Sequence, residues 1–270
     1  MTDKAKNRLA YEASIKAAVL NRVRELHGKK DVCIAAEFVV DRFKRRADLV
    51  VVGSTLEVFE IKSKADSLSR LQGQVDSYLA FFEKVTLVVD TKHANKVLRA
   101  TTTDVAVWEY EDGRLRVRRK GKTHKLKSIS SLTTLLSVAE LRKLVTRLGV
   151  AASSKRRAEL LSHAEKFSAG EVRRVTLDLV REKLQPNTYE FWSVVGRRRV
   201  APEHLYALSP ILLKRRRYAK RHEETIGLWR QWGQQTFSST DEPNSEAGTY
   251  SKGVDVFGSN PDSENLYELT

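Results

Sequence analysis

Residues 45 to 90 read RRADLVVVGSTLEVFEIKSKADSLSRLQGQVDSYLAFFEKVTLVVD and decide the fold. Two runs rich in Val, Leu and Phe, at 45 to 52 and 55 to 62, flank a Gly-Ser turn, which is typical of a β-hairpin. The apolar run KVTLVVD, at 84 to 90, predicts a buried strand. The stretch between hairpin and strand is helical in pattern, so this part of the chain is an α/β domain.

The helix inside this stretch is predicted from about Leu68 to Phe82, with Asp66 or Ser67 as its N-cap. Upstream, apolar residues at helical spacing predict a helix over residues 4 to 27. A β-like run follows at 32 to 40. The order helix, three strands, helix, strand predicts a mixed sheet with helices on its faces.

Beyond this core the pattern gives one more strand pair and then becomes helical. The pair spans 105 to 110 and 115 to 118, around a turn sequence. Two S-x-x-E capping boxes mark helix starts, and two further segments have helical character. These features are Ser137 to Glu140, Ser168 to Glu171, 155 to 167 and 186 to 235. The second half of the chain is therefore predicted to be α-helical.

Three charged residues stand out in the hairpin. Asp48 lies near the start of one predicted strand, and Glu60 and Lys62 lie at the end of the next, on one face of it. A two-residue turn would place Asp48 and Glu60 on opposite faces, whereas a three-residue loop or a bulge would place them opposite each other. Only the second register brings two carboxylates to one place, where a hard cation such as Mg²⁺ can bind.

The pattern resembles the PD-(D/E)XK nuclease superfamily over roughly residues 5 to 110. RADLVVV looks like the Asp motif, with Ala47 where the motif name has proline, and EIK at 60 to 62 looks like the (D/E)XK motif. Gln74 and Tyr78 are similar to the Q-x-x-x-Y element of RecB-like members. The resemblance implies a restriction-endonuclease-like fold and phosphodiester hydrolysis that depends on Mg²⁺, with Mn²⁺ as a substitute.

The resemblance also implies the site residues. Asp48, Glu60 and the backbone carbonyl of Ile61 are the expected metal ligands, and Lys62 the residue that orients water or stabilises charge. Gln74 and Tyr78 either line the same cleft or satisfy polar groups beside the sheet. A further acidic ligand is expected. The candidates are Glu12, which is preferred because it lies in line with the apolar stripe of the first helix, Glu25 and Glu37.

The charge of the chain indicates a polyanionic partner. Its 49 Lys and Arg against 34 Asp and Glu give a formal net charge of +15, a field that attracts nucleic acid. Residues 136 to 164 resemble a SAP-like helix-loop-helix, in which Lys155, Arg156 and Arg157 would meet phosphate. Arg46 and Arg70 are further candidates for phosphate contacts near the metal, although a solvated strand edge explains Arg46 nearly as well.

Three segments are expected: a nuclease-like domain at 1 to 125, a basic helical DNA-binding domain at 129 to 235, and an acidic tail at 236 to 270. The composition shows neither a membrane span nor an apolar signal segment, so a cytoplasmic protein is expected. The predicted function is that of a DNA nuclease, with RNA as an alternative substrate. A homodimer is one of the assemblies that such a nuclease forms. The alternative function is a nuclease-fold module that binds nucleic acid without turnover.

Overall fold

The computed structural model describes most of the first 209 residues and a short helical piece beyond them. The described residues are 3–28, 32–40, 45–126, 128–151, 154, 156–209, 223–228, 230 and 231. Lys155 and the predicted tail at 236 to 270 lie outside them. Contacts divide the chain into a compact unit at Met1–Lys220 and a second unit at Arg221–Thr270. Among the described residues, no helix combines the length and apolarity that crossing a membrane requires.

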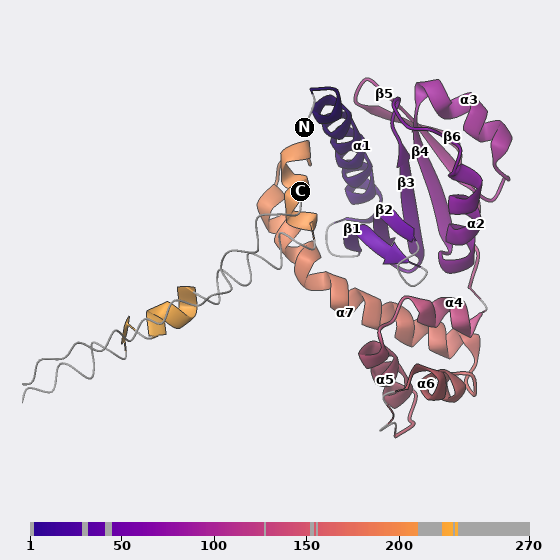
Figure 1. The fold of residues 1–270 in the computed structure, drawn as a ribbon, viewed down its shortest axis with the longest axis vertical. Helices are drawn as coiled ribbons and strands as arrows, with labels where there is room; N and C mark the ends of the chain where they lie inside the picture. The colour runs from indigo at the N-terminus through magenta and orange to yellow at the C-terminus, as the bar shows by residue number, and fades with distance from the viewer. Residues whose placement is uncertain are drawn as a thin grey trace, which may run out of the picture. The chain divides into compact units, whose positions relative to one another are not determined.

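The compact unit is built on a six-stranded mixed sheet whose strands lie in chain order (Figure 1). The first three strands are antiparallel, the third to fifth are parallel, and the sixth returns antiparallel as an edge strand. The strands are β1 (Cys33–Val40), β2 (Arg45–Val52), β3 (Leu56–Lys62), β4 (Lys84–Asp90), β5 (Ala106–Glu111) and β6 (Arg114–Arg119). The predicted mixed sheet is confirmed.

The register of the first three strands places three acids in line. Val52 pairs with Leu56, so the β2–β3 connection has three residues, and Leu49 pairs with Phe59. Continuing that register puts Asp48 opposite Glu60. On the other side of β2, the pairs on either side of Glu37 put Glu37 opposite Asp48. The three-residue connection is the one that the metal-site hypothesis required.

Helices cover both faces of the sheet (Figure 1). On one face α1 (Asp3–His27) buries Ile15, Val19 and Val23 against apolar residues of the sheet that include Leu49 and Phe59. On the other face lie α2 (Leu71–Phe81) and α3 (Thr91–Ala100), which share a second apolar core with the helical part of the chain. The sheet is buried on both sides, which explains why its inner strands read as continuous apolar runs.

Two helix predictions on this second face need correction. The helix α2 begins later than predicted: its N-cap is Arg70, because the Asp66 carboxylate accepts hydrogen bonds from the Ser63 amide and hydroxyl instead, at 2.8 and 2.6 Å. The helix α3 was not predicted. Asp90, the last residue of a strand, is also its N-cap and accepts a hydrogen bond from the Lys92 amide at 2.9 Å.

The helical part packs against the sheet and does not form a separate body. It contains α4 (Ile129–Thr134), α5 (Val138–Arg147), α6 (Arg157–Ala164), α7 (Ala169–Val195) and a 3-10 helix, η1 (Pro202–Leu208). Both predicted capping boxes are confirmed, at Ser137 and Ser168. The helix α7 continues through Pro186 and contacts β1 and β2. The predicted nuclease-like domain and the described part of the predicted helical domain up to Ser209 therefore share one compact unit.

Candidate functional site

Asp48 occupies the centre of the acid row, which consists of Glu37, Asp48 and Glu60. Its Oδ2 accepts a hydrogen bond from the Ile61 amide at 2.6 Å, which ties the carboxylate to the neighbouring strand. Burial and the Glu60 carboxylate raise the pKa of Asp48 to about 7, and Lys16 opposes that rise. A second positive charge beside Asp48 would act in the same direction as Lys16 and favour the charged carboxylate.

Four predicted site residues form one hydrogen-bonded network around Glu60. Its Oε1 accepts from Lys62 Nζ at 2.7 Å and from Gln74 Nε2 at 2.5 Å, and its Oε2 accepts from the Tyr78 hydroxyl at 2.7 Å. Glu60 is 3% exposed. Burial and the Glu60 charge raise the pKa of Tyr78, so its hydroxyl remains a donor. The α2 side chains thus fix the orientation of the Glu60 carboxylate.

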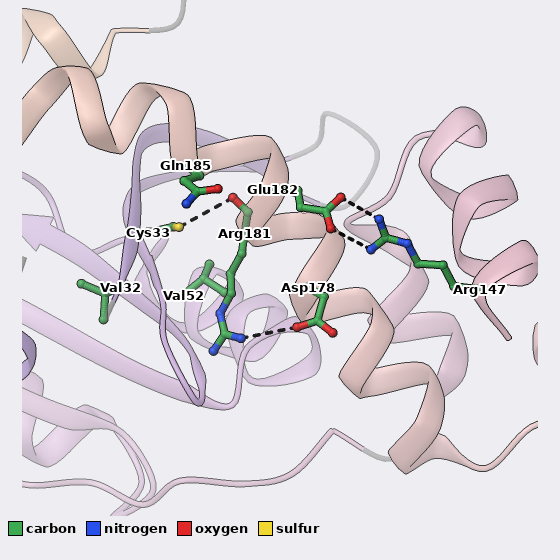
Figure 2. A pocket seen from close by; sticks show the side chains of 8 residues that line it. All are labelled: Val32, Cys33, Val52, Arg147, Asp178, Arg181, Glu182 and Gln185. Atoms are coloured by element: carbon green, nitrogen blue, oxygen red, sulfur yellow. Dashed lines mark hydrogen bonds and ion pairs between the residues drawn. The ribbon is translucent and has the colours of Figure 1, made fainter. Parts of the chain in front are cut away.

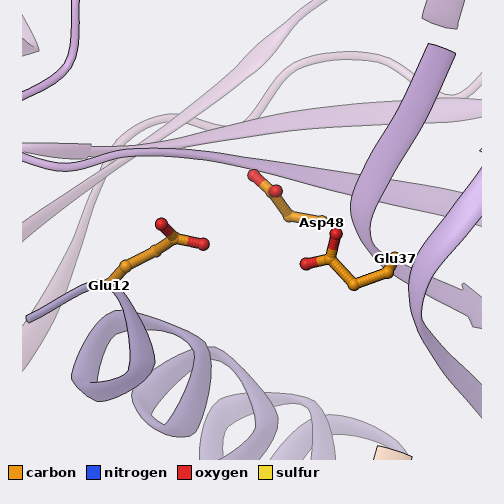
Figure 3. Close-up of side chains that lie close together, drawn as sticks. All are labelled: Glu12, Glu37 and Asp48. Atoms are coloured by element: carbon orange, nitrogen blue, oxygen red, sulfur yellow. The ribbon is translucent and has the colours of Figure 1, made fainter. Parts of the chain in front are cut away.

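A second group of acids meets Asp48 from the other side. Carboxylate oxygens of Glu12, Glu37 and Asp48 lie within 4.8 Å of one another, and Figure 3 shows them converging from α1, β1 and β2. Glu25, the other candidate on α1, pairs with Arg22 at 3.2 Å instead. Glu12 was the preferred additional acid and Glu37 the third choice, and the structure brings both to Asp48.

Glu60 is not a member of this close group, because its oxygens are held by Lys62, Gln74 and Tyr78. The predicted ligand set of Asp48, Glu60, Ile61 and Glu12 is therefore divided in the structure. Glu37 also has a backbone φ of 53°. This left-handed conformation is strained for a side chain larger than glycine, and such strain concentrates at functional sites.

Lys16 is a site residue that the sequence analysis did not find. Its Nζ lies 2.9 Å from Glu12 Oε1 and 2.7 Å from Glu37 Oε1, so the acids already hold an internal cation. Burial alone would lower the pKa of Lys16, but Asp48, Glu37 and Glu12 raise it. The available signal was its spacing of four residues from Glu12 on one helix.

The donor set of this cluster fits a hard divalent cation. Carboxylate oxygens are the ligands that Mg²⁺ prefers, and Asp48, Glu12 and Glu37 present three carboxylates within reach of one ion. Lys16 holds two of the three. An ion bound by all of them would therefore share the Glu12 and Glu37 carboxylates with the Lys16 ammonium.

The predicted phosphate-binding residues near the site lie at the surface. Arg46 is 68% exposed in its side chain and donates from Nε to Glu37 Oε2 at 2.7 Å, so it borders the acid row. Arg70 is exposed at the N-terminus of α2. Both positions leave the guanidinium groups accessible to a ligand.

The predicted phosphate-binding residues of the helix-loop-helix differ in their exposure and in their hydrogen bonds. Arg156 is exposed, with 85% of its side chain accessible. Arg157 donates to the carbonyl oxygens of Leu136 and Thr133 at 2.8 and 2.7 Å. It therefore holds the C-terminal end of α4 and is not free to bind phosphate as predicted. Lys155 lies outside the described residues.

A separate pocket lies where α7 and α5 meet the ends of β1 and β2 (Figure 2). Val32, Cys33 and Val52 line it together with charged residues of the two helices. Arg147 pairs with Glu182 at 2.8 Å, and Arg181 pairs with Asp178 at 3.5 Å and donates to the Gly53 carbonyl. Each charged side chain that lines this pocket therefore has an ionic partner within it.

Three comparisons place the chain among known proteins. A family model described as Bacteriophage P4 protein cII matches residues 5–209. Protein cII of Enterobacteria phage P4 is 30% identical over 191 residues, which cover 68% of this chain and 72% of that protein. A solved protein of unknown function from Silicibacter pomeroyi matches with a TM-score of 0.35 and 19% identity, over 51% of this chain and 94% of that one. The family model spans more than half of the sequence, and the chain belongs to the bacteriophage P4 protein cII family.

Proposed function

We propose that this protein is a metal-dependent nuclease that hydrolyses phosphodiester bonds of DNA, with a restriction-endonuclease-like sheet as its scaffold. The observation that carries the proposal is the register of β2 and β3, which puts Asp48 opposite Glu60. Lys62 donates to Glu60 from the same strand. An acid on one strand facing an acid and a lysine on the next is the arrangement that the superfamily uses for metal-assisted hydrolysis.

The side chains of the site have different roles in the proposed reaction. Asp48, Glu12 and Glu37 would hold a Mg²⁺ ion, which would supply Lewis acidity and lower the pKa of a bound water. Glu60 holds the Lys62 ammonium at 2.7 Å. From there Lys62 can orient the attacking water or stabilise negative charge on phosphate oxygens. Gln74 and Tyr78 hold Glu60 in place and so act as positioning residues.

The substrate class follows from charge. The formal net charge of +15 creates a positive electrostatic field, which raises the encounter rate with nucleic acid. The exposed Arg46 and Arg70 can bind phosphates beside the acid row. We take DNA as the substrate, with RNA as the alternative, and the cytoplasm as the compartment. A homodimer would allow both strands of a duplex to be cut.

One observation favours a second function, a nuclease-fold module that binds nucleic acid without cutting it. Lys16 already neutralises two of the three clustered acids at 2.7 and 2.9 Å. If that internal cation stays in place, the site binds no metal and the scaffold serves only to bind.

A cleavage assay separates the two functions. The wild type is incubated with plasmid and with oligonucleotides in Mg²⁺, Mn²⁺ or EDTA, beside Lys62→Ala and Lys84→Ala. The second variant is a matched control, because Lys84 is also a strand lysine paired with a glutamate, Glu57 at 3.3 Å. Cleavage that needs metal, persists in Lys84→Ala and is lost in Lys62→Ala supports the nuclease. Binding without cleavage in any metal supports the module, and neither binding nor cleavage contradicts both.

A further inference from the structure

A basic hollow lies between the helix α1 and the edge strand β6. It has a volume of about 560 Å³ and is lined by four arginines and a single acid, together with Ala18, Asn21, Trp108 and apolar residues of β6. The charged residues are Arg22, Arg114, Arg116, Arg199 and Glu25. Glu25 pairs with Arg22 at 3.2 Å, which leaves the other three arginines without an acid of their own in the hollow.

The arginines of β6 fall into two kinds. Arg118 pairs with Glu109 at 2.7 Å, and Arg119 donates to the carbonyls of Val105 and Thr101 at 2.7 and 3.1 Å. These two hold the sheet edge together. Among the described residues, the Arg114 and Arg116 side chains have neither an ion pair nor a hydrogen bond. Positive groups gathered in one hollow without acids repel one another, and an anionic ligand relieves that repulsion.

The helix α1 connects this hollow to a second one. Ala10, Ser14, Ala18 and Arg22 are spaced four residues apart and therefore form one row along the helix. Ala18 and Arg22 line the basic hollow, and Ala10 and Ser14 line a second hollow of about 540 Å³. Twelve residues of helix extend about 18 Å.

The second hollow begins beside the proposed catalytic strand. Ser63 and Lys64, which directly follow Lys62, line it from the side of the sheet. Lys64 also places its ammonium 4.7 Å from the centre of the Tyr11 ring, on α1. The row of small residues on α1 thus begins beside the residues that follow β3 and ends at the arginines of the basic hollow.

The basic hollow also has apolar surface. Leu115 and Val117 of β6 line it, and Val117 is 44% exposed. Apolar surface beside arginines suits a single strand, whose phosphates meet the guanidiniums while an unpaired base lies on the apolar side chains. A duplex presents its bases inside the helix and gains nothing from that surface.

We propose that one strand of the substrate is held in the basic hollow by Arg114, Arg116 and Arg199 and runs along α1 to the second hollow, beside the end of β3. The inference rests on the proposed function and adds the path of the nucleic acid. Charged side chains on an edge strand also prevent pairing with other sheets. That role predicts aggregation on their removal, whereas the proposed role predicts weaker binding by a protein that stays monodisperse.

The test measures binding of a fluorescent single strand of about 20 nucleotides in EDTA, by anisotropy, over a range of salt concentrations. The double variant Arg114→Ala/Arg116→Ala is compared with Lys96→Ala/Arg99→Ala, a matched loss of two exposed charges on α3. We expect the Kd of the β6 variant to rise about tenfold and its salt slope to shrink by about 1.4, because two phosphate contacts are lost at about 0.7 each. The α3 variant should stay within about twofold of the wild type. Thermal melts check that both variants are folded.

Several outcomes overturn the inference while the proposed function stands. They are unchanged binding by the β6 variant, an equal loss in both variants, or equal weakening for single strand and duplex. Displacement of the strand by polyglutamate of matched charge would show that the hollow binds any polyanion, which also contradicts a nucleic-acid path. If the wild type binds no nucleic acid at all, the proposed function itself fails.

Discussion

Two groups of charged residues in this chain differ in how fully their charges are paired. In the helical part, acids and bases are matched: Arg147 with Glu182 and Arg181 with Asp178 in the pocket of Figure 2. The same holds deeper in the fold, where Arg173 makes two bonds to Glu83, at 2.5 and 2.7 Å. Around Asp48 the acids outnumber the bases: among the described residues, the carboxylates of Glu12, Glu37 and Asp48 lie within 4.8 Å of one another (Figure 3), and they pair with two bases, Lys16 and Arg46.

This difference indicates which charged residues stabilise the fold and which bind a ligand. A matched pair compensates its own cost of burial and needs no further partner. An unmatched group of half-buried acids raises the free energy of the folded state and persists only where something else compensates it. Here the raised pKa of Asp48 reports that cost. Each of the following substitutions tests whether the two groups differ in this way.

The largest effect is expected from breaking the deepest matched pair. Arg173→Ala leaves Glu83, 2% exposed, without its main partner. Loss of one member of a buried pair costs about 3 kcal/mol of unfolding free energy, because the remaining charge is uncompensated. Urea unfolding measures the loss, with Arg174→Ala, an exposed neighbour on the same helix, as the control. A loss no larger than that of the control would show that this pair does not hold α7 to the sheet.

For a substitution of Asp48, in the acid row, we expect the unfolding free energy to rise instead of fall. The pKa of Asp48 is about 7 in the folded chain, against 3.8 for an aspartate in water, so the folded state holds this proton more tightly. Its contribution to the unfolding free energy is therefore fully present below about pH 4 and is lost as pH rises through about 7. Asp48→Asn keeps an acceptor for the Ile61 amide and removes the charge.

In EDTA near pH 8 Asp48→Asn should stabilise the protein by on the order of 2 kcal/mol, after allowance for partial exposure. Near pH 4 it should change little. Urea titrations at the two pH values measure the difference. Destabilisation by this variant at the higher pH would show that the acids are already compensated without a metal.

A smaller effect is expected for the internal cation. Lys16→Met removes the ammonium from Glu12 and Glu37, so the clustered acids repel one another and the unfolding free energy falls by about 1 kcal/mol in EDTA. Mg²⁺ should then raise the melting temperature of the variant by more than it raises that of the wild type. Thermal melts with and without Mg²⁺ compare the two proteins. An equal response would separate Lys16 from the proposed metal site.

The smallest effect is expected at the surface of the helical part. Arg147 and Glu182 are about half exposed, at 41% and 50% of their side chains. Exposed ion pairs contribute little because water and salt screen them. Arg147→Ala should therefore melt at the wild-type temperature, within the error of the measurement, at low and at high salt. A clear loss would mean that this pair, too, holds the fold.

Much of the fold could be predicted because its signals are local. The bounds of β2 follow from a run of apolar residues between charged ones and a turn, and both capping boxes are read from four consecutive residues. From the same local signals, whether Asp48 lies opposite Glu60 depended only on the length of the β2–β3 connection. Three residues there bring Asp48 opposite Glu60.

What the sequence could not give depends on contacts between distant segments. The phosphate role predicted for Arg157 was wrong because the ends of α4 and α6 meet in space, where its guanidinium binds two carbonyls. Lys16 was missed because its acids come from α1 and β1, which are 21 residues apart at Lys16 and Glu37. The short helix α3 was missed because its N-cap, Asp90, is also the last residue of the strand β4, and because packing of Ala94 and Val97 against the core contributes to its stability.

The most direct measurement is the binding of Mn²⁺, followed by electron paramagnetic resonance of the free ion. It compares the wild type with Asp48→Asn from the acid row and Asp178→Asn from the matched group. Saturable binding that Asp178→Asn retains and Asp48→Asn abolishes is the predicted result. Equal binding by all three proteins, or none by the wild type, would contradict a metal site at the acid row.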